Sequence, residues 1–157
     1  RFIKSDFREL ISMKILMVCL GNICRSPLAH GVMEHLAKSK GLNWHVDSAG
    51  TGSWHIGHAP DSRSIKVAQA YGVDISGQRA RQFQPTDFDT FDRIFVMDQE
   101  NLKNVLAMAK NAEQKAKVSL LLGDEVVPDP YWDNQLFEPV YQMIEQACER
   151  IIAEERP

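Results

Sequence analysis

Short apolar runs alternate along this chain with segments whose apolar residues recur at helical spacing. The runs that fit strands lie at residues 14–19, 44–48, 93–97 and 118–122. Each connection between them is long enough to contain a helix, so consecutive strands are expected to be parallel. The sequence therefore predicts an α/β fold: a single three-layer domain, with a four-stranded parallel sheet and helices on both faces.

Four helices are expected between and after these strands. The first runs from Pro27 to about Gly41, the second follows an N-cap at Asp61 and ends at Gly72, and the third is capped by Asp98. The last helix has the clearest apolar stripe, formed by Phe137, Val140, Tyr141, Ile144, Ala147, Cys148 and Ile151. Because in such sheets ligands bind beyond the carboxyl ends of the strands, the loop after residue 19 is the first place to look for a site.

The length of the chain, 157 residues, suits one domain that buries its own core. We expect this domain to span residues 13–157, with Met13 as the true start because a strand follows it at once. Residues 1–12 are then expected to be an N-terminal extension outside the fold or a start-site artefact.

The composition of the chain argues against nucleic-acid binding, membrane insertion, secretion and a fold held by disulfides. A net charge of -3 gives no general reason to bind nucleic acid, so an anionic substrate needs a local positive site. No apolar run is long enough to span a membrane, and the first residues do not resemble a signal peptide. Three cysteines are too few for a disulfide framework, which indicates a reducing compartment and a cytoplasmic protein.

The stretch VCLGNICRSP, residues 18–27, contains the strongest candidate for a site. Cys-x5-Arg is a weak pattern alone, but here it joins a strand to a helix start through residues that tolerate unusual backbone angles. Such a loop turns its N–H groups inward, and the helix adds its positive end. Arg25 would grip two oxygens of an anion, and the same field would stabilise a thiolate at Cys19. We name residues 19–25 the phosphate loop.

Other interpretations of the cysteines fit less well. Neither the Cys19/Cys24 spacing nor the isolated His55 and His58 supplies a zinc site, and Cys-x4-Cys is not the spacing of a thioredoxin-like pair. A nucleotide-binding loop would need Gly-x4-Gly-Lys-Ser/Thr, which is absent. For Cys24, a structural role and a protective redox partnership both stay open. Cys148 is expected in the core.

Together with DSAGTGSW (47–54), FVMD (95–98) and PDPYW (128–132), this stretch resembles the low-molecular-weight protein tyrosine phosphatase family. The resemblance runs from Met13 nearly to the C-terminus. It implies a hydrolase that removes phosphate from phosphotyrosine in proteins, and from small aryl phosphates, through a phosphocysteine intermediate. It also implies no metal or other cofactor, with inorganic phosphate or another oxyanion as product or inhibitor.

The resemblance further implies a role for each matched residue. Cys19 is the nucleophile, Arg25 holds the phosphate, and Asp129 is the general acid that then serves as base, although an Asp between two prolines also suits a plain turn. Ser26 is expected to hydrogen-bond the Cys19 sulfur, and Asn22 to brace the loop. Substrate is expected to contact the loop residues and three aromatic walls, namely Leu20, Gly21, Asn22, Ile23, Cys24, Ser26, Trp54, Tyr131 and Trp132.

Some positions depart from the family or need no special role. Relatives that resemble phosphoarginine phosphatases carry Thr where this chain has Ile23, and the bulkier side chain favours an aryl ester. Many relatives carry an acid where this chain has His30, to which we assign no role. A place at the end of a strand explains Ser48, and a role as helix N-cap explains Asp98. His45, His55 and His58 are expected in loops or on the surface.

Two rival functions stay open. An arsenate reductase on the same scaffold would need further cysteines to relay electrons, and only Cys148 follows Cys24. A phospho-binding or redox-sensing module without turnover would need no proton donor, so the presence of Asp129 disfavours it.

Overall fold

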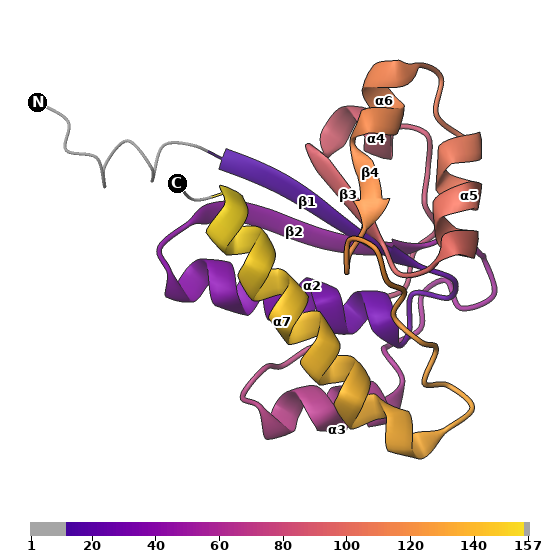
Figure 1. The fold of residues 1–157 in the computed structure, drawn as a ribbon. Coiled ribbons are helices and arrows are strands. Elements are labelled where there is room, and N and C mark those ends of the chain that lie inside the picture. Colours follow the sequence, from indigo (N-terminus) through magenta and orange to yellow (C-terminus); the bar gives the residue numbers. More distant parts are fainter. Residues whose placement is uncertain (1–11, 156–157) are drawn as a thin grey trace, which may run out of the picture.

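The computed structural model describes residues 12–155 and contains one four-stranded parallel sheet in the order β2-β1-β3-β4 (Figure 1). The strands are β1 (Ser12–Cys19), β2 (Asn43–Gly50), β3 (Arg93–Val96) and β4 (Val118–Leu120). β1 lies inside the sheet, where Cys19 pairs with Gly50 of β2 and Val18 pairs with Val96 of β3. The carboxyl end of β1 is therefore flanked by strands on both sides, at a point where the strand order reverses.

Four longer helices follow the predicted pattern: α2 (Arg25–Ser39), α3 (Ser62–Ala70), α5 (Gln99–Ala107) and α7 (Phe137–Glu155). Asp61 caps α3 and Asp98 caps α5, as the sequence predicts, because each side chain accepts a backbone N–H of the first turn. The sequence pattern does not predict the short helices α4 (Asp87–Thr90) and α6 (Ala112–Ala116), or the 3₁₀ turn η1 (Asn134–Leu136).

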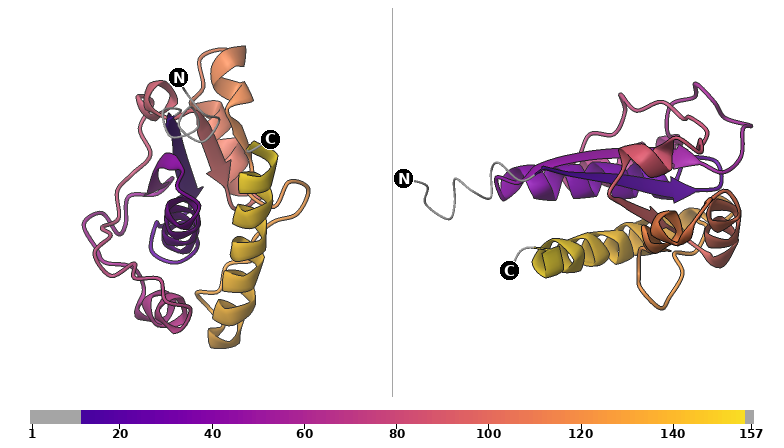
Figure 2. Two further views of the ribbon diagram at one scale, coloured as in Figure 1. Left: turned by 90° about the vertical axis from the view of Figure 1, so that its left-hand side faces the viewer. Right: turned by 90° about the horizontal axis from the view of Figure 1, so that it is seen from above.

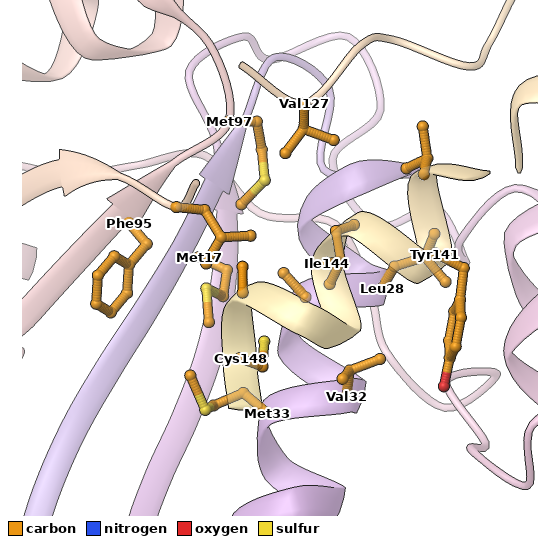
Figure 3. Close-up of a cluster of buried hydrophobic side chains, with 14 of the residues drawn as sticks. Met17, Leu28, Val32, Met33, Phe95, Met97, Val127, Tyr141, Ile144 and Cys148 are labelled. Carbon is orange, nitrogen blue, oxygen red and sulfur yellow. The ribbon is translucent and has the colours of Figure 1, made fainter. Parts of the chain in front are cut away.

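Alternate residues of β1 face two separate apolar clusters. Ile15 and Met17 point toward α2, α3 and α7, whereas Leu16 and Val18 point toward α5 and the aromatic residues around α4. Figures 1 and 2 show α2, α3 and α7 gathered on one side of the sheet. The larger cluster, drawn in Figure 3, packs α7 against α2 through side chains such as Ile144 and Leu28. The predicted fold class, with helices on both faces, is confirmed.

Element boundaries differ slightly from the prediction. Ser12 pairs with Asn43 and so belongs to β1, although it was assigned to the N-terminal extension. Residues 1–11 of that extension lie outside the described residues. β2 is longer than predicted at both ends, because it pairs with the whole of β1. Within residues 12–155, no helix combines the length and the apolar composition needed to cross a membrane.

Candidate active site

The phosphate loop begins where β1 ends and closes on the first residue of α2. Cys19 and Arg25, its two ends, are both buried. The N-cap residue Cys24 makes no side-chain capping bond, and the first turn of α2 carries no acidic residue. The positive end of a 15-residue helix is thus left to act on the loop.

A small polar cluster beneath the loop holds the Cys19 sulfur. The Asn22 backbone N–H donates to Cys19 Sγ at 3.3 Å, and Ser26 Oγ lies 3.0 Å from the same sulfur. The predicted hydrogen bond between Ser26 and Cys19 is therefore present. Asn22 Nδ2 donates to Ser26 Oγ at 2.8 Å, which leaves the hydroxyl proton free to point at the sulfur. Both donors would stabilise an anionic sulfur.

Asn22 adopts the left-handed backbone conformation, with φ 57°, which is one of the unusual backbone angles that the loop residues tolerate. Its side-chain oxygen accepts the backbone N–H of Arg81 at 3.0 Å. Arg81 is itself fixed by ion pairs with Asp47 and with buried Asp87. The loop is therefore braced from a segment almost 60 residues downstream. Asn22 and Ser26 lie behind the loop and do not line the cavity described below.

The segment after β2 packs closely against the loop. Thr51 N–H donates to the Cys19 carbonyl and Gly52 N–H to the Leu20 carbonyl, each at 2.9 Å. A side chain at Gly50 would place its Cβ only 2.8 Å from the Leu20 carbonyl oxygen, closer than real Cβ atoms approach. Gly50 thus permits a backbone contact that fixes the loop from its other side.

Arg25 is aimed by two partners from distant parts of the chain. Its Nη1 donates to Asp98 Oδ2 at 2.7 Å and to the Val127 carbonyl at 3.0 Å. Burial disfavours the charged guanidinium, but the Cys19 charge and Asp98 outweigh it and raise the pKa of Arg25 above its ordinary value. Arg25 therefore stays cationic beside the sulfur. Asp98 thus has a second role that its N-cap position did not reveal.

A cavity of about 310 Å³ opens above the loop. Cys19 and Arg25 line it from the loop, and Asp129 lines it from the segment that follows Val127. We name residues 128–134 the acid loop. Asp129 is exposed, and its Oδ1 accepts the Tyr131 N–H at 3.0 Å. The cavity thus brings Cys19 and Arg25 together with Asp129, which lies 110 positions after Cys19 in the sequence.

Side chains of the cavity wall are largely apolar. Trp54, Tyr131 and Trp132 line the cavity, as predicted, and the rings of Tyr131 and Trp132 meet edge to face. The remaining predicted loop residues on the wall are Leu20, Gly21, Ile23 and Cys24. His55 was expected in a loop or on the surface, yet it also lines the cavity and lies against Gly21. An aryl group attached to an anion would fit such a wall.

The three cysteines, all among the described residues, form no disulfide and differ in environment. Burial, with repulsion from Asp61, raises the pKa of the Cys24 thiol to about 12, so this thiol stays protonated near neutral pH. Cys148 lies in the core between α7 and α2, where burial raises its pKa as well. Of the three sulfur atoms, that of Cys19 accepts a backbone N–H near the N-terminus of a helix.

Comparison with known proteins identifies the family. A family model described as low molecular weight phosphotyrosine protein phosphatase matches residues 14–156. The chain belongs to this family. A putative low molecular weight protein-tyrosine-phosphatase of Synechocystis is 42% identical over 149 residues, which cover 89% of this chain and 94% of that protein.

Two solved phosphatases have the same fold. Vibrio vulnificus Wzb in complex with benzylphosphonate superposes with a TM-score of 0.82 at 31% identity, covering 90% of this chain and 98% of Wzb. A Drosophila arginine phosphatase superposes with a TM-score of 0.87 at 34% identity, covering 92% of this chain and 99% of its own. The family resemblance predicted from the sequence is confirmed, and the phosphatase fold occurs with more than one named substrate class.

Proposed function

We propose that this phosphatase hydrolyses phosphotyrosine in proteins, and small aryl phosphates, through a phosphocysteine intermediate on Cys19. One observation carries the proposal. The Cys19 sulfur, with its two hydrogen-bond donors, and the Asp129 carboxyl group line the same cavity from different segments. A nucleophile and a proton donor on one cavity are the two groups that cleavage of a phosphate monoester requires.

In the first half of the reaction, the Cys19 thiolate attacks phosphorus and an S–P bond forms. The P–O bond to the aryl group breaks, and Asp129, as the carboxylic acid, gives its proton to the departing oxygen. Arg25 and the N–H groups of the phosphate loop hold the three equatorial oxygens, whose negative charge is spread in the transition state. The aryl ring lies between the aromatic side chains of the wall.

In the second half, water attacks the phosphocysteine and the S–P bond breaks. The Asp129 carboxylate takes a proton from this water, so the acid of the first step is the base of the second. The products are inorganic phosphate and the Cys19 thiolate, which the Ser26 hydroxyl and the Asn22 N–H stabilise as leaving group. No metal or cofactor enters either step.

Several observations favour this function over its rivals. An arsenate reductase would relay electrons through a further accessible thiol, and Cys148 is fully buried in the core. A binding module would not need Asp129. Ile23 and the three aromatic residues suit an aryl ester rather than phosphoarginine. The free cysteines favour a reducing compartment, and we infer a cytoplasmic enzyme acting on phosphotyrosine proteins rather than nucleic acid or membranes.

Hydrolysis of phenyl phosphate by three variants tests the proposal. Cys19→Ser should lose at least about 10⁴-fold in kcat, as expected when a nucleophile is removed. Asp129→Asn should lose about 10²-fold or more, whereas Asp124→Asn, an exposed acid just before the acid loop, should stay near wild type. The proposal is wrong if Cys19→Ser keeps its activity or if a chelator abolishes turnover by the wild type. Phosphoarginine, offered in parallel, should be the poorer substrate.

A further inference from the structure

Arg63, the second residue of α3, lies outside the cavity and takes no part in the proposed chemistry. Its guanidinium nevertheless contacts the acid loop. Nη1 donates to the Tyr131 carbonyl at 3.0 Å and to Asn134 Oδ1 at 2.6 Å. The same group lies over the rings of Tyr131 and Phe137, with 5.3 and 4.5 Å to the ring centroids. One side chain therefore holds the whole segment from Tyr131 to the start of α7.

The other side of the guanidinium is tied to Asp61. Nε and Nη2 of Arg63 donate to the two carboxylate oxygens at 3.0 and 2.9 Å, a paired geometry that lysine cannot reproduce. These hydrogen bonds from Arg63 lower the pKa of Asp61, so the carboxylate stays charged. The Asp61 backbone N–H donates to the Ile23 carbonyl of the phosphate loop at 2.8 Å. A continuous series of bonds thus runs from the phosphate loop through Asp61 and Arg63 to the acid loop.

Asp129 lies between two anchored carbonyl groups. On one side, Arg25 holds the Val127 carbonyl at 3.0 Å, and on the other side Arg63 holds the Tyr131 carbonyl. Pro128 and Pro130 flank Asp129 and restrict the backbone between these anchors. The Tyr131 residue that Arg63 holds also donates its N–H to Asp129 Oδ1. The position of the carboxyl group therefore depends on both arginines.

We propose that Arg63 is a positioning residue, which holds Asp129 where it can protonate the leaving oxygen above Cys19. The inference rests on the proposed function, because it requires Asp129 to be the acid. Arg63 also packs on Phe137 of the core, so a loss of activity alone would not separate positioning from folding. The dependence of the rate on the leaving group distinguishes these two roles. A misplaced acid slows esters of a poor leaving group more than those of a good one, whereas a loss of folded protein slows both equally.

The experiment compares phenyl phosphate, which needs protonation of its leaving oxygen, with p-nitrophenyl phosphate, which needs it far less. Arg63→Met keeps an unbranched apolar side chain over the two rings and removes every hydrogen bond of the guanidinium, while the backbone N–H of residue 63 still donates to Asp61. We expect the loss of kcat/KM, which reports the step in which the leaving group departs, to be greater on phenyl phosphate than on p-nitrophenyl phosphate by about 10-fold or more. Arg63→Lys should lie between, and Arg79→Met, an exposed arginine outside both loops, should match wild type on both esters.

Two further measurements complete the test. The double variant Arg63→Met/Asp129→Asn should be no slower on phenyl phosphate than Asp129→Asn, because the two changes remove one function. Inhibition by inorganic phosphate should be unchanged in Arg63→Met, since the phosphate loop keeps its own bonds. An equal loss on both esters, or a loss that adds to that of Asp129→Asn, overturns the inference. If Asp129→Asn itself shows no preference between the esters, the proposed function fails instead.

Discussion

The phosphate loop and the acid loop serve one cavity but are built in opposite ways. In the phosphate loop and the turn that follows it, Cys19, Asn22, Arg25 and Ser26 are all 5% exposed or less, and they bond to one another or to buried neighbours. In the acid loop Asp129 is exposed and Trp132 is 87% exposed. In the proposed mechanism, the groups that hold the developing charge are thus fixed before substrate arrives, whereas Asp129, which meets the leaving oxygen, lies exposed where products depart.

The largest effect is expected where the buried loop loses its brace. Asn22→Ala removes both side-chain hydrogen bonds and places a Cβ-bearing residue without local polar support at φ 57°. We expect kcat/KM to fall by about 100-fold and the free energy of unfolding by about 3 kcal/mol. Steady-state kinetics and urea denaturation measure the two effects.

Two controls show whether the comparison between the loops holds. Asn22→Gly keeps the backbone conformation and loses only the hydrogen bonds, so it should lose less activity than Asn22→Ala. Trp132→Ala, in the acid loop, should change the free energy of unfolding by less than about 0.5 kcal/mol. Equal stability losses for Asn22→Ala and Trp132→Ala would remove the proposed contrast.

A smaller effect is expected at Asp98, which joins the two regions through Arg25. Asp98→Asn keeps an N-cap side chain for α5 but removes the charge opposite Arg25. The inhibition constant for inorganic phosphate should rise about 10-fold, because a hydrogen bond to a charged group contributes about 1.5–3 kcal/mol. Asp89→Asn, on an exposed position of α4, serves as the control. Unchanged phosphate inhibition in Asp98→Asn would show that Arg25 is aimed without this carboxylate.

The cavity rim offers a milder test, at Gly52. A Cβ at this position would overlap the Trp54 ring, although its backbone needs no special conformation. Gly52→Ala should therefore move the indole and raise KM for phenyl phosphate about threefold, the value of one aromatic contact, with phosphate inhibition unchanged. In a Trp54→Ala background the same change should have no effect. An effect that persists there would mean that Gly52 acts through the phosphate loop, whose Leu20 carbonyl it contacts.

The smallest effect is expected in the pH dependence of stability, at His30 on α2. His30 is mostly buried, its Nδ1 lies 3.1 Å from Ser48 Oγ, and burial lowers its pKa despite the nearby Glu34 and Asp47 carboxylates. The unfolded chain then binds the proton more readily than the folded one below about pH 6.5, so stability falls as pH drops through that value.

His30→Gln should remove this dependence. Below about pH 6.5 the wild type should lose up to about 1.4 kcal/mol per pH unit more than the variant, measured by urea denaturation at several pH values. Curves of equal slope for the two proteins would mean that the folded state accommodates the charged imidazole.

The sequence predicted best what depends on neighbouring residues. Apolar runs and N-caps at Asp61 and Asp98 placed the strands and long helices, because both signals are local. The helix α4 was missed because its one aromatic residue, Phe88, packs against the second face of the sheet together with Phe91 just after the helix and Phe83 from a preceding irregular segment. Nothing in the local pattern distinguishes these residues from a loop.

The same distinction holds for the site. Cys19, Asn22 and Ser26 interact within eight positions, and the family resemblance of that one stretch implied their contacts. Asp98 was assigned to capping alone, because its carboxylate meets Arg25 from 73 residues away. The local sequence around His55 and Arg63 did not indicate a place at the site. His55 lies there because it packs against Gly21, and Arg63 because it donates to the acid loop.

The bonds of Arg25 also bear on how the enzyme is made. Its guanidinium depends on groups 73 and 102 residues further along the chain, so neither partner exists when the phosphate loop is first synthesised. A nascent chain that ends after β3 would carry the thiol and the guanidinium but neither of the groups that orient the guanidinium. The contacts that complete the site are among its longest in sequence, and we expect them to form late in folding, because closing a long loop costs entropy before the contact is gained. We therefore expect the ribosome-bound fragment to have no phosphatase activity. Catalysis should begin only when nearly the whole chain has been released.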